Sequence, residues 1–449
     1  MVVLTVASFT YVTAQINATG TIASVALDIP FQYAVYVGLV SILLCSMLGG
    51  MRGVTWTQVA QYIVLIIAYL LPVFWISNKM GAGFFPHFML ADEVSRIAEL
   101  EAQFGFVKNS AENLKEVPKG LAGITKAHSA VNATPWAFIS LALAMMMGTA
   151  SLPHVMMRYF TTPSVKAARK SVGWSLFFIF LLYSSAPMLA TLSKLSLIDP
   201  TLPTGIIGKS ISDVQAIDWY QNWNQANLMF VSDFNGNGTL ELNEFFMGGK
   251  AVVLATPEIA GLPYVISGLV AAGGMAAAMS TADGLILAIA NAISHDVYYK
   301  IIDPKAETAK RLVVARVLLV VIGFAGATIA ALEIQGILGS VIWAFDFAMS
   351  GLFFPLVLGV WWKRANKEGA IAGMFLGLVS GAAYLVWVRT GGSGFLGITQ
   401  LTFGIFGSAV SLVAMVVVSL MTQAPNAATQ KMVDEVRVPA GKSILGKQH

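Results

Sequence analysis

The chain has 449 residues and a formal net charge of +4; 57% of its residues are hydrophobic, whereas only 11% are charged. Soluble domains carry about 25% charged residues. This composition, with a mean hydropathy of +0.73, therefore excludes a water-soluble enzyme and predicts a chain that lies mostly in a lipid bilayer. The single cysteine, Cys45, excludes a disulfide scaffold and a cysteine-based metal cluster.

Apolar runs along the chain predict an all-α polytopic membrane protein with about ten spans, because each span needs about 20 apolar residues. The runs cover residues 2–27, 31–50, 55–77, 135–157, 171–193, 262–289, 312–332, 336–361, 370–388 and 398–421. Two intervening segments are too polar for hydrocarbon. They are an amphipathic, mixed-charge insert at 78–134 and an Asn-, Asp- and Gly-rich insert at 194–261. A polar tail follows at 422–449.

Alternate connections between these runs differ in charge. The connections after the second, fourth, sixth and eighth runs, together with the tail, hold 17 of the 27 Lys and Arg residues. Cytoplasmic loops of membrane proteins carry an excess of Lys and Arg. The sequence therefore predicts a multi-pass protein of the plasma (inner) membrane with both termini cytoplasmic and both inserts external. Chance clustering is the alternative.

The fourth run is interrupted between Gly148 and Pro153. Proline removes a backbone donor, and glycine loosens the preceding turn. A broken helix at membrane depth is tolerated where it lines a cavity, and its free ends can bind ions. Both residues are therefore candidates for a substrate or coupling site. A simple proline kink is the alternative.

A face of small residues in the sixth run predicts a cation site. Ala277, Ser280 and Thr281 fall within about one helical turn, so one backbone carbonyl and two hydroxyls can converge on a point. Uncharged oxygen ligands suit a monovalent cation. The alternative is a helix-packing seam, for which Ala, Ser and Thr are also typical.

Two acidic residues, Asp283 and Asp346, lie well within predicted spans. Acids inside a membrane face cavities, pair with cations or titrate, and so are functional candidates; a structural acid is the alternative. The chain has no nucleophile–base pair, phosphate-binding loop or metalloprotease motif, and its five histidines are scattered. We therefore expect neither an enzyme nor a nucleic-acid partner.

Together, four parts of the sequence resemble the sodium:solute symporter family, in the branch that includes cation/acetate symporters, and the likeness runs over about residues 1–421. The residues that carry it are GGMRGVTWTQVAQ at 49–61, GTASLPHVMMRYF at 148–160, AAMSTAD at 277–283 with SHDVYY at 294–299, and WKRANKEGAIAG at 362–373. The resemblance implies part of a five-plus-five inverted-repeat transporter fold, in which Na⁺ and substrate bind near the bilayer midplane.

The resemblance assigns the runs within 1–77 to core helices 3–5, those within 135–193 to core helices 6–7 and those within 262–361 to core helices 8–10. Two peripheral helices follow at 362–421. It implies that the first three helices of the family pattern are absent here. An incomplete gene product, a late start or a membrane partner subunit that supplies those helices are the alternatives.

In function, the resemblance implies Na⁺-coupled symport of a small organic solute, such as acetate or another short monocarboxylate. It places Na⁺ ligands at Ala277, Ser280 and Thr281, and it gives Asp283 a role in orienting ligands or titrating. Gln58 stands where sugar- and proline-transporting relatives carry an acid, which makes it a substrate or coupling candidate. A membrane sensor for solute or Ca²⁺, or an incomplete fragment that does not transport, are the alternatives.

The external insert also contains an EF-hand-like loop at 233–244. Its predicted Ca²⁺ ligands stand at positions 1, 3, 5, 7, 9 and 12, with glycine at position 6, and are Asp233, Asn235, Asn237, Thr239, Glu241 and Glu244. This spacing wraps six or seven oxygens around one Ca²⁺ ion. We expect short helices on both sides of the loop and weak or moderate affinity; an ordinary Asn/Gly turn is the alternative.

Overall fold

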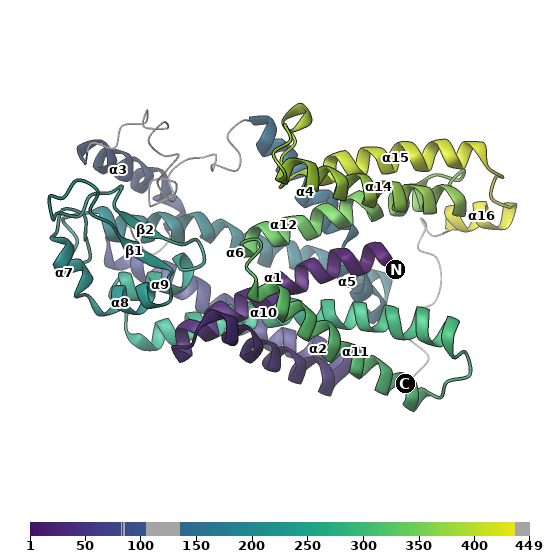
Figure 1. Ribbon diagram of the computed structural model, residues 1–449, viewed down its shortest axis with the longest axis horizontal. Helices are drawn as coiled ribbons and strands as arrows, with labels where there is room; N and C mark the ends of the chain where they lie inside the picture. Colours follow the sequence, from purple (N-terminus) through teal and green to yellow (C-terminus); the bar gives the residue numbers. More distant parts are fainter. Residues whose placement is uncertain (82, 84–85, 105–134, 436–449) are drawn as a thin grey trace.

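The helices run mostly along the long axis of the molecule (Figure 1). The structure is a computed structural model that describes residues 1–81, 83, 86–104 and 135–435. The remainder of the first predicted insert, from 105 to 134, and the end of the tail, from 436, lie outside the described residues.

Each predicted span falls on a helical stretch. These stretches belong to α1 (Val2–Leu27), α2 (Phe31–Lys79), α4 (Pro135–Ser151) with α5 (Pro153–Met156), α6 (Val165–Ile198), α10 (Tyr264–Asn291), α11 (Thr308–Ala331), α12 (Ile337–Ala348) with α13 (Phe354–Trp361), α14 (Lys367–Arg389) and α15 (Phe403–Met421). The 49 residues of α2 include two predicted spans, separated at Gly50. Its φ of 53° favours glycine, so this residue permits the break.

Short elements extend or connect these helices. They are the 3₁₀ turns η1 (Pro86–Phe88), η4 (Met157–Thr161) and η7 (Phe395–Gly397), the π-helices η5 (Ala292–Ile302) and η6 (Met349–Phe353), and α16 (Ala427–Glu435). Because η5 continues α10 without interruption, the helix that carries the predicted cation site reaches Ile302, well beyond the predicted end at 289.

By length and apolarity, seven helices of the described residues qualify alone as membrane spans, and up to nine spans result if each of two bent helix pairs is one span. The sequence predicted ten because it counted Val2–Leu27 and Phe31–Met47 separately, whereas these helices form one pair bent by 111°. The multi-pass, all-α architecture is confirmed.

In the part of the fold that contains α1 and α2, the central helix is α10, which packs against α1, α2 and α11. The buried side chains of this contact form one cluster, made of Val12, Ile16, Val35, Leu39, Ile42, Val54, Ala282, Leu285, Ile286, Leu287, Ile289, Ala290, Leu319, Ile322, Ala327 and Ala330. Lipid is as apolar as these side chains, so close packing, rather than escape from water, holds such helices together.

The C-terminal part is organised around α14 and α15, which lie side by side (Figure 1). Four buried glycines recur at every fourth residue of α14: Gly369, Gly373, Gly377 and Gly381. A Cβ at Gly373 would lie 3.0 Å from the Cβ of Met415 on α15. The glycine row therefore allows the two backbones to approach closely.

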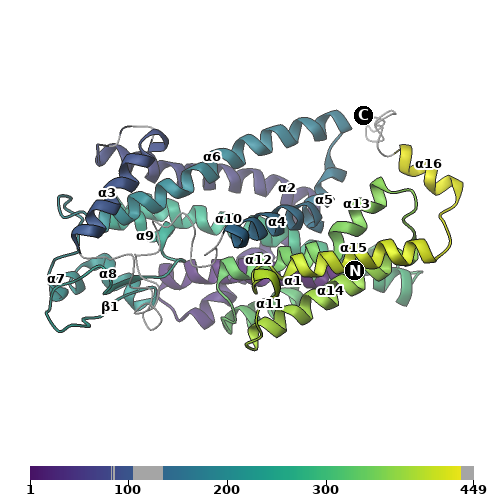
Figure 2. The ribbon, with the colours of Figure 1, turned by 90° about the horizontal axis from the view of Figure 1, so that it is seen from above.

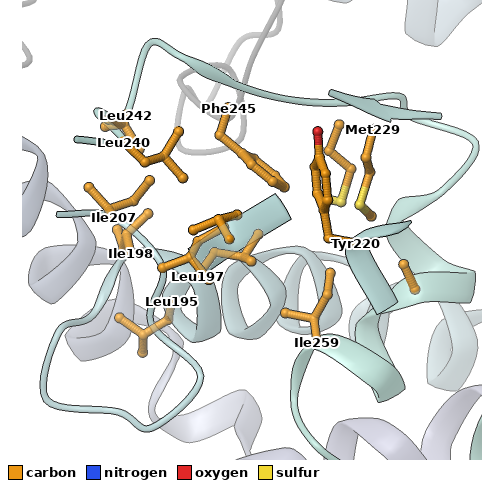
Figure 3. Close-up of a cluster of buried hydrophobic side chains, with 14 of the residues drawn as sticks. Leu195, Leu197, Ile198, Ile207, Tyr220, Met229, Leu240, Leu242, Phe245 and Ile259 are labelled. Carbon is orange, nitrogen blue, oxygen red and sulfur yellow. The ribbon is translucent and has the colours of Figure 1, made fainter. Parts of the chain in front are cut away.

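The second predicted insert folds at one end of the molecule, opposite α13 and α16 (Figure 2). It contains α7 (Ile211–Gln215), α8 (Asp218–Gln225), the antiparallel strands β1 (Met229–Val231) and β2 (Phe245–Met247), and α9 (Val252–Ile259). Its hydrophobic core joins Leu240 and Phe245 to Leu197 at the end of α6 and Ile259 of α9 (Figure 3).

The mixed-charge stretch of the first insert forms α3 (Leu90–Gln103), and it packs onto the second insert. Ile97 and Leu100 of α3 belong to the same hydrophobic core. The fully buried Lys194 of α6 pairs with Glu101, and Arg96 pairs with Asp199. The described part of the first predicted insert and the second insert therefore form one folded unit over the ends of the spanning helices.

This arrangement makes a prediction about sidedness. The helix α7 and the chain just before α11 lie at opposite ends of the molecule (Figure 1). Asp213 belongs to the first of these segments and Lys305 to the second, and both are exposed. In a Cys45→Ala background, Asp213→Cys should react with an impermeant thiol reagent in intact cells, and Lys305→Cys only after the membrane is opened. Labelling of both positions from the same side would contradict the predicted orientation.

Candidate functional site

The predicted cation ligands lie on one face of α10. Ala277, Ser280 and Thr281 are each half-buried. The Ser280 hydroxyl donates to the Ala277 carbonyl oxygen at 2.8 Å, so two of the three predicted ligand oxygens are adjacent. The buried cluster begins at Ala282. The polar face therefore borders the most tightly packed region of the helix.

Gln58 of α2 reaches this same turn of α10. Its side-chain nitrogen Nε2 donates to the Ser280 carbonyl oxygen at 2.5 Å, and Gln58 itself is 9% exposed. Its oxygen Oε1 accepts a hydrogen bond from Nη1 of Arg158, which lies in η4. The structure thus joins Gln58, a predicted substrate or coupling residue, to Ser280, a predicted sodium ligand. On its other side, Gln58 is hydrogen-bonded to the guanidinium of Arg158.

Asp283 follows on the buried side of α10. The side chain is 0% exposed, and its Oδ1 accepts a hydrogen bond from the Ser46 hydroxyl of α2 at 2.9 Å. The other carboxylate oxygen, Oδ2, is buried and has no hydrogen-bond partner among the described residues. Asp283 therefore lies in the α2–α10 contact, behind the half-buried face of Ser280.

The interruption of the fourth predicted span is a bend of 48° between α4 and α5. Pro153 occupies the start of α5, where its missing N–H costs no hydrogen bond. A Cβ at Gly148 would lie 2.5 Å from the Cβ of Phe345, so this glycine allows α4 to pack against α12. His154, just after the bend, makes an edge-to-face contact with Tyr11 of α1 at 5.8 Å.

Asp346 lies elsewhere, at the contact between α12 and α15. It is 0% exposed and lies close to the backbone amides of Phe403 and Gly404 at the start of α15. Neither carboxylate oxygen has a well-formed hydrogen bond to any described residue. The positive end of a helix dipole favours a nearby carboxylate, and Asp346 lies at this end of α15.

The EF-hand-like loop directs its predicted ligand side chains inward. Both oxygens of Asp233 accept backbone hydrogen bonds, from Gly236 at 2.7 Å and from Gly238 at 3.0 Å. The amide nitrogens of Asn235 and Asn237 both donate to Oε1 of Glu241, at 2.8 and 3.0 Å. Positions 3, 5 and 9 of the loop thus converge.

The last predicted ligand of the loop, Glu244, is 0% exposed. Its two oxygens accept the backbone amides of Phe234 and Glu241, at 2.9 and 3.0 Å. Among the described residues, Glu244 has no ion-pair partner. Within that same part of the chain, no three His, Cys, Asp or Glu side chains form a group that could hold a metal ion. The amide oxygens of Asn235 and Asn237 would have to complete any site here.

The prediction of short helices on both sides of the loop is wrong. Residues 229–231 and 245–247 form the paired strands β1 and β2, with Phe230 opposite Phe246. Leu240, at position 8, pairs with a neighbouring segment: its N–H donates to the Lys209 carbonyl, and its own carbonyl accepts the Gly208 N–H, both at 2.8 Å. Aromatic and β-branched residues such as Phe230, Val231 and Phe245 are enriched in strands, where they pack against cross-strand neighbours.

Sequence reasoning did not identify Arg158 and Ser46 as site residues. Arg158 entered it as one of the basic residues that indicate sidedness and as part of the family-like stretch 148–160, although it follows Pro153 by five residues. A basic residue immediately after a broken helix is a usable signal, because helix breaks at membrane depth line cavities. Ser46 gave no signal, since a single serine in an apolar run is common.

The chain was compared with known families and proteins. The sequence model of the sodium:solute symporter family matches residues 1–197 and 250–377, and so leaves out most of the second insert. An uncharacterized symporter of Cupriavidus necator is 33% identical over 503 aligned positions, which cover 92% of this chain and 73% of that protein. A monocarboxylic acid transporter of Corynebacterium glutamicum is 27% identical over 390 positions, covering 86% of this chain and 61% of that protein.

Among solved structures, the fold resembles a Na⁺-coupled sialic acid symporter in a substrate-bound, outward-open state. The TM-score is 0.57 at 17% sequence identity, and the match covers 94% of this chain and 74% of that one. At this identity the likeness concerns the fold alone, and it confirms the predicted helical transporter architecture.

The contact at Gly148 makes a prediction about stability. Gly148→Ala should lower the melting temperature of the purified protein, because the added methyl group overlaps Phe345; overpacking of this kind costs about 1–3 kcal/mol. Gly53→Ala is the matched control, since a Cβ there meets nothing within 4 Å. It should leave the melting temperature unchanged or raise it. Equal melting temperatures for Gly148→Ala and the parent would exclude the tight contact.

Proposed function

The chain belongs to the sodium:solute symporter family, and on that premise we propose that it couples Na⁺ entry to the uptake of a small organic solute, a short monocarboxylate such as acetate. As a member of this family it is a multi-pass membrane transporter and not an enzyme. The proposal concerns the coupling ion, the solute and the residues that bind them.

The observation that carries the proposal is the polar turn of α10. The Ser280 hydroxyl and the Ala277 carbonyl oxygen lie 2.8 Å apart on a half-buried face, with Thr281 next to them. Oxygen ligands without a full charge can replace part of the hydration shell of Na⁺ while leaving the ion free to dissociate. Gln58 on the adjacent α2 donates a hydrogen bond to the Ser280 carbonyl oxygen, so a second helix contacts this turn.

Two observations support an anionic solute. One of the similar proteins is named a monocarboxylic acid transporter. In addition, position 58 holds a neutral amide that contacts Arg158, and no carboxylate stands there to repel an anion. The alternatives, a membrane sensor and a fragment that does not transport, predict no solute flux. Uptake of labelled acetate by cells that express the chain, with and without Na⁺, separates them from transport.

Replacing the hydroxyl ligands tests the sodium site. Ser280→Ala and Thr281→Ala should each weaken the apparent affinity for Na⁺, measured from the Na⁺ dependence of acetate uptake. Loss of one buried neutral partner costs about 1–3 kcal/mol, which corresponds to a factor of roughly 5 to 150 in affinity.

Ser267→Ala is the control on the same helix, more than three turns from Ser280 toward the start of α10, and should leave the Na⁺ dependence unchanged. If both hydroxyl variants keep the parent's Na⁺ dependence, the site assignment is wrong. Absence of Na⁺-stimulated uptake in the parent chain would instead refute symport itself.

As a second function, we propose that the loop at 233–244 binds Ca²⁺. The supporting observation is Glu244, a fully buried carboxylate that has hydrogen bonds but no cationic side chain paired with it in the described structure. Buried charges are normally paired or coordinate a metal ion. Ca²⁺ also suits six or seven oxygen ligands with a bidentate glutamate at the last position.

Calorimetric titration of the purified chain should detect Ca²⁺ binding with a Kd of about 10⁻⁴–10⁻³ M, the range of extracellular modules. Glu244→Gln and the exposed Glu241→Gln should each weaken it at least about tenfold, because each removes a ligand charge. Asp213→Asn, an acid of the same insert outside the loop, should have no effect. If the parent chain gives no calorimetric signal at millimolar Ca²⁺, the proposal of Ca²⁺ binding is refuted and the loop is an ordinary Asn/Gly turn.

A further inference from the structure

Arg158 is placed beside the proposed sodium site by two hydrogen bonds in series. Its guanidinium donates to Oε1 of Gln58, and Nε2 of the same amide donates to the Ser280 carbonyl oxygen. Two hydrogen bonds of about 3 Å and the width of one amide separate the guanidinium from Ser280 by no more than about 8 Å. A permanent positive charge therefore stands next to the turn that is proposed to bind a positive ion.

One turn beyond Ser280, α10 has a glycine, Gly284, whose missing side chain leaves room for the guanidinium of Arg158. A Cβ built at Gly284 would lie 3.2 Å from Nη2 of Arg158 and 3.9 Å from Nε2 of Gln58. The guanidinium thus lies over the Gly284 position, where a side chain would meet it, in addition to its link to α10 through Gln58. Arg158 is half-buried, so its charge is only partly screened by solvent.

From this geometry we propose that Arg158 and Na⁺ compete for the same face of α10. In this proposal, the guanidinium is a tethered cation that holds Gln58 and Ser280 together in the absence of Na⁺, and Na⁺ binding displaces it. The proposal rests on the sodium site at Ala277, Ser280 and Thr281. It adds a residue that sets the affinity of that site and is not one of its ligands.

Displacing Arg158 has a mechanical consequence. Arg158 belongs to η4, which directly continues α5 after the bend at Pro153. The contacts of α10 with α1, α2 and α11 are a continuous hydrophobic cluster, whereas α5 and η4 are a few residues long. Na⁺ binding would therefore move the short segment rather than α10, and so would couple ion occupancy to the position of the broken helix.

The test compares Na⁺ affinities by binding of radiolabelled Na⁺ to the purified full chain. Arg158→Met removes the charge and keeps most of the side-chain length. It should tighten Na⁺ binding at least about tenfold, since charges this close repel strongly in a partly buried site. Arg158→Lys keeps the charge and should stay within about threefold of the parent. Arg169→Met, which removes an exposed arginine of α6, is the matched control and should change nothing.

A structural role for Arg158 predicts the opposite sign, because a disturbed site binds Na⁺ more weakly. Gln58→Met provides a second variant if Arg158→Met does not fold: it removes the anchor of the guanidinium and should also tighten Na⁺ binding. Melting temperatures establish that each variant is folded.

Ser280→Ala separates this proposal from the one on which it rests. If Ser280→Ala weakens Na⁺ binding while Arg158→Met and Gln58→Met leave it unchanged or weaker, the competition is refuted and the sodium site stands. If Ser280→Ala and Thr281→Ala have no effect on Na⁺ binding, the sodium site and the competition at it are both refuted. Tightening by Arg158→Met together with weakening by Ser280→Ala is the result that supports both.

Discussion

The packing of α10 against α1, α2 and α11 is the contact on which the rest of the structure depends. It fixes one side of α10 in a continuous apolar cluster and leaves a half-buried polar face at Ala277, Ser280 and Thr281. In a membrane such packing must come from shape, because burying apolar side chains against lipid gains little. A helix that is fixed by close packing on one side can present polar oxygens on its other side while its position stays the same.

Around this helix, polar side chains connect elements that are distant in sequence. Ser46 and Gln58 of α2 reach Asp283 and Ser280, which are three residues apart on α10, and Arg158 extends the connection to the segment after the broken helix. Hydrogen bonds of this kind are strong where water is scarce. They join the α10 face at Ser280 and Asp283 to α2 and to the segment after the broken helix.

The folded unit over the ends of the spanning helices has a hydrophobic core of its own. Its core of buried aliphatic and aromatic side chains joins α3, the end of α6, α7 to α9 and the two strands (Figure 3). The family model passes over residues 198–249, so α7, α8 and the two strands are an addition to the part of the chain that the family shares, whereas α3 and α9 lie within that part. The folded unit is attached to the transporter helices by continuous chain at α6 and α9. It also contacts the end of α1, where Gln225 donates to Asp28 at 3.1 Å.

The sequence by itself determined the membrane-spanning class, the approximate position of every long helix and the family, and it predicted the α10 residues that we propose as ligands. These follow from local quantities: apolar run length, the spacing of Ala277, Ser280 and Thr281 within one turn, and short motifs. Spacing within the loop also indicated that its polar side chains would turn inward, as those of Asp233 and Glu244 do.

The tertiary structure alone decided which distant residues meet. The break at Gly50, the Ser46 partner of Asp283, the position of Asp346 at the start of α15 and the Arg158–Gln58–Ser280 chain all depend on how separate helices pack. The strands beside the loop depend likewise on pairing between residues 229–231 and 245–247, which overrides local preference. Periodicity constrains only neighbours along one element, whereas contacts between elements follow from side-chain shape across the whole fold.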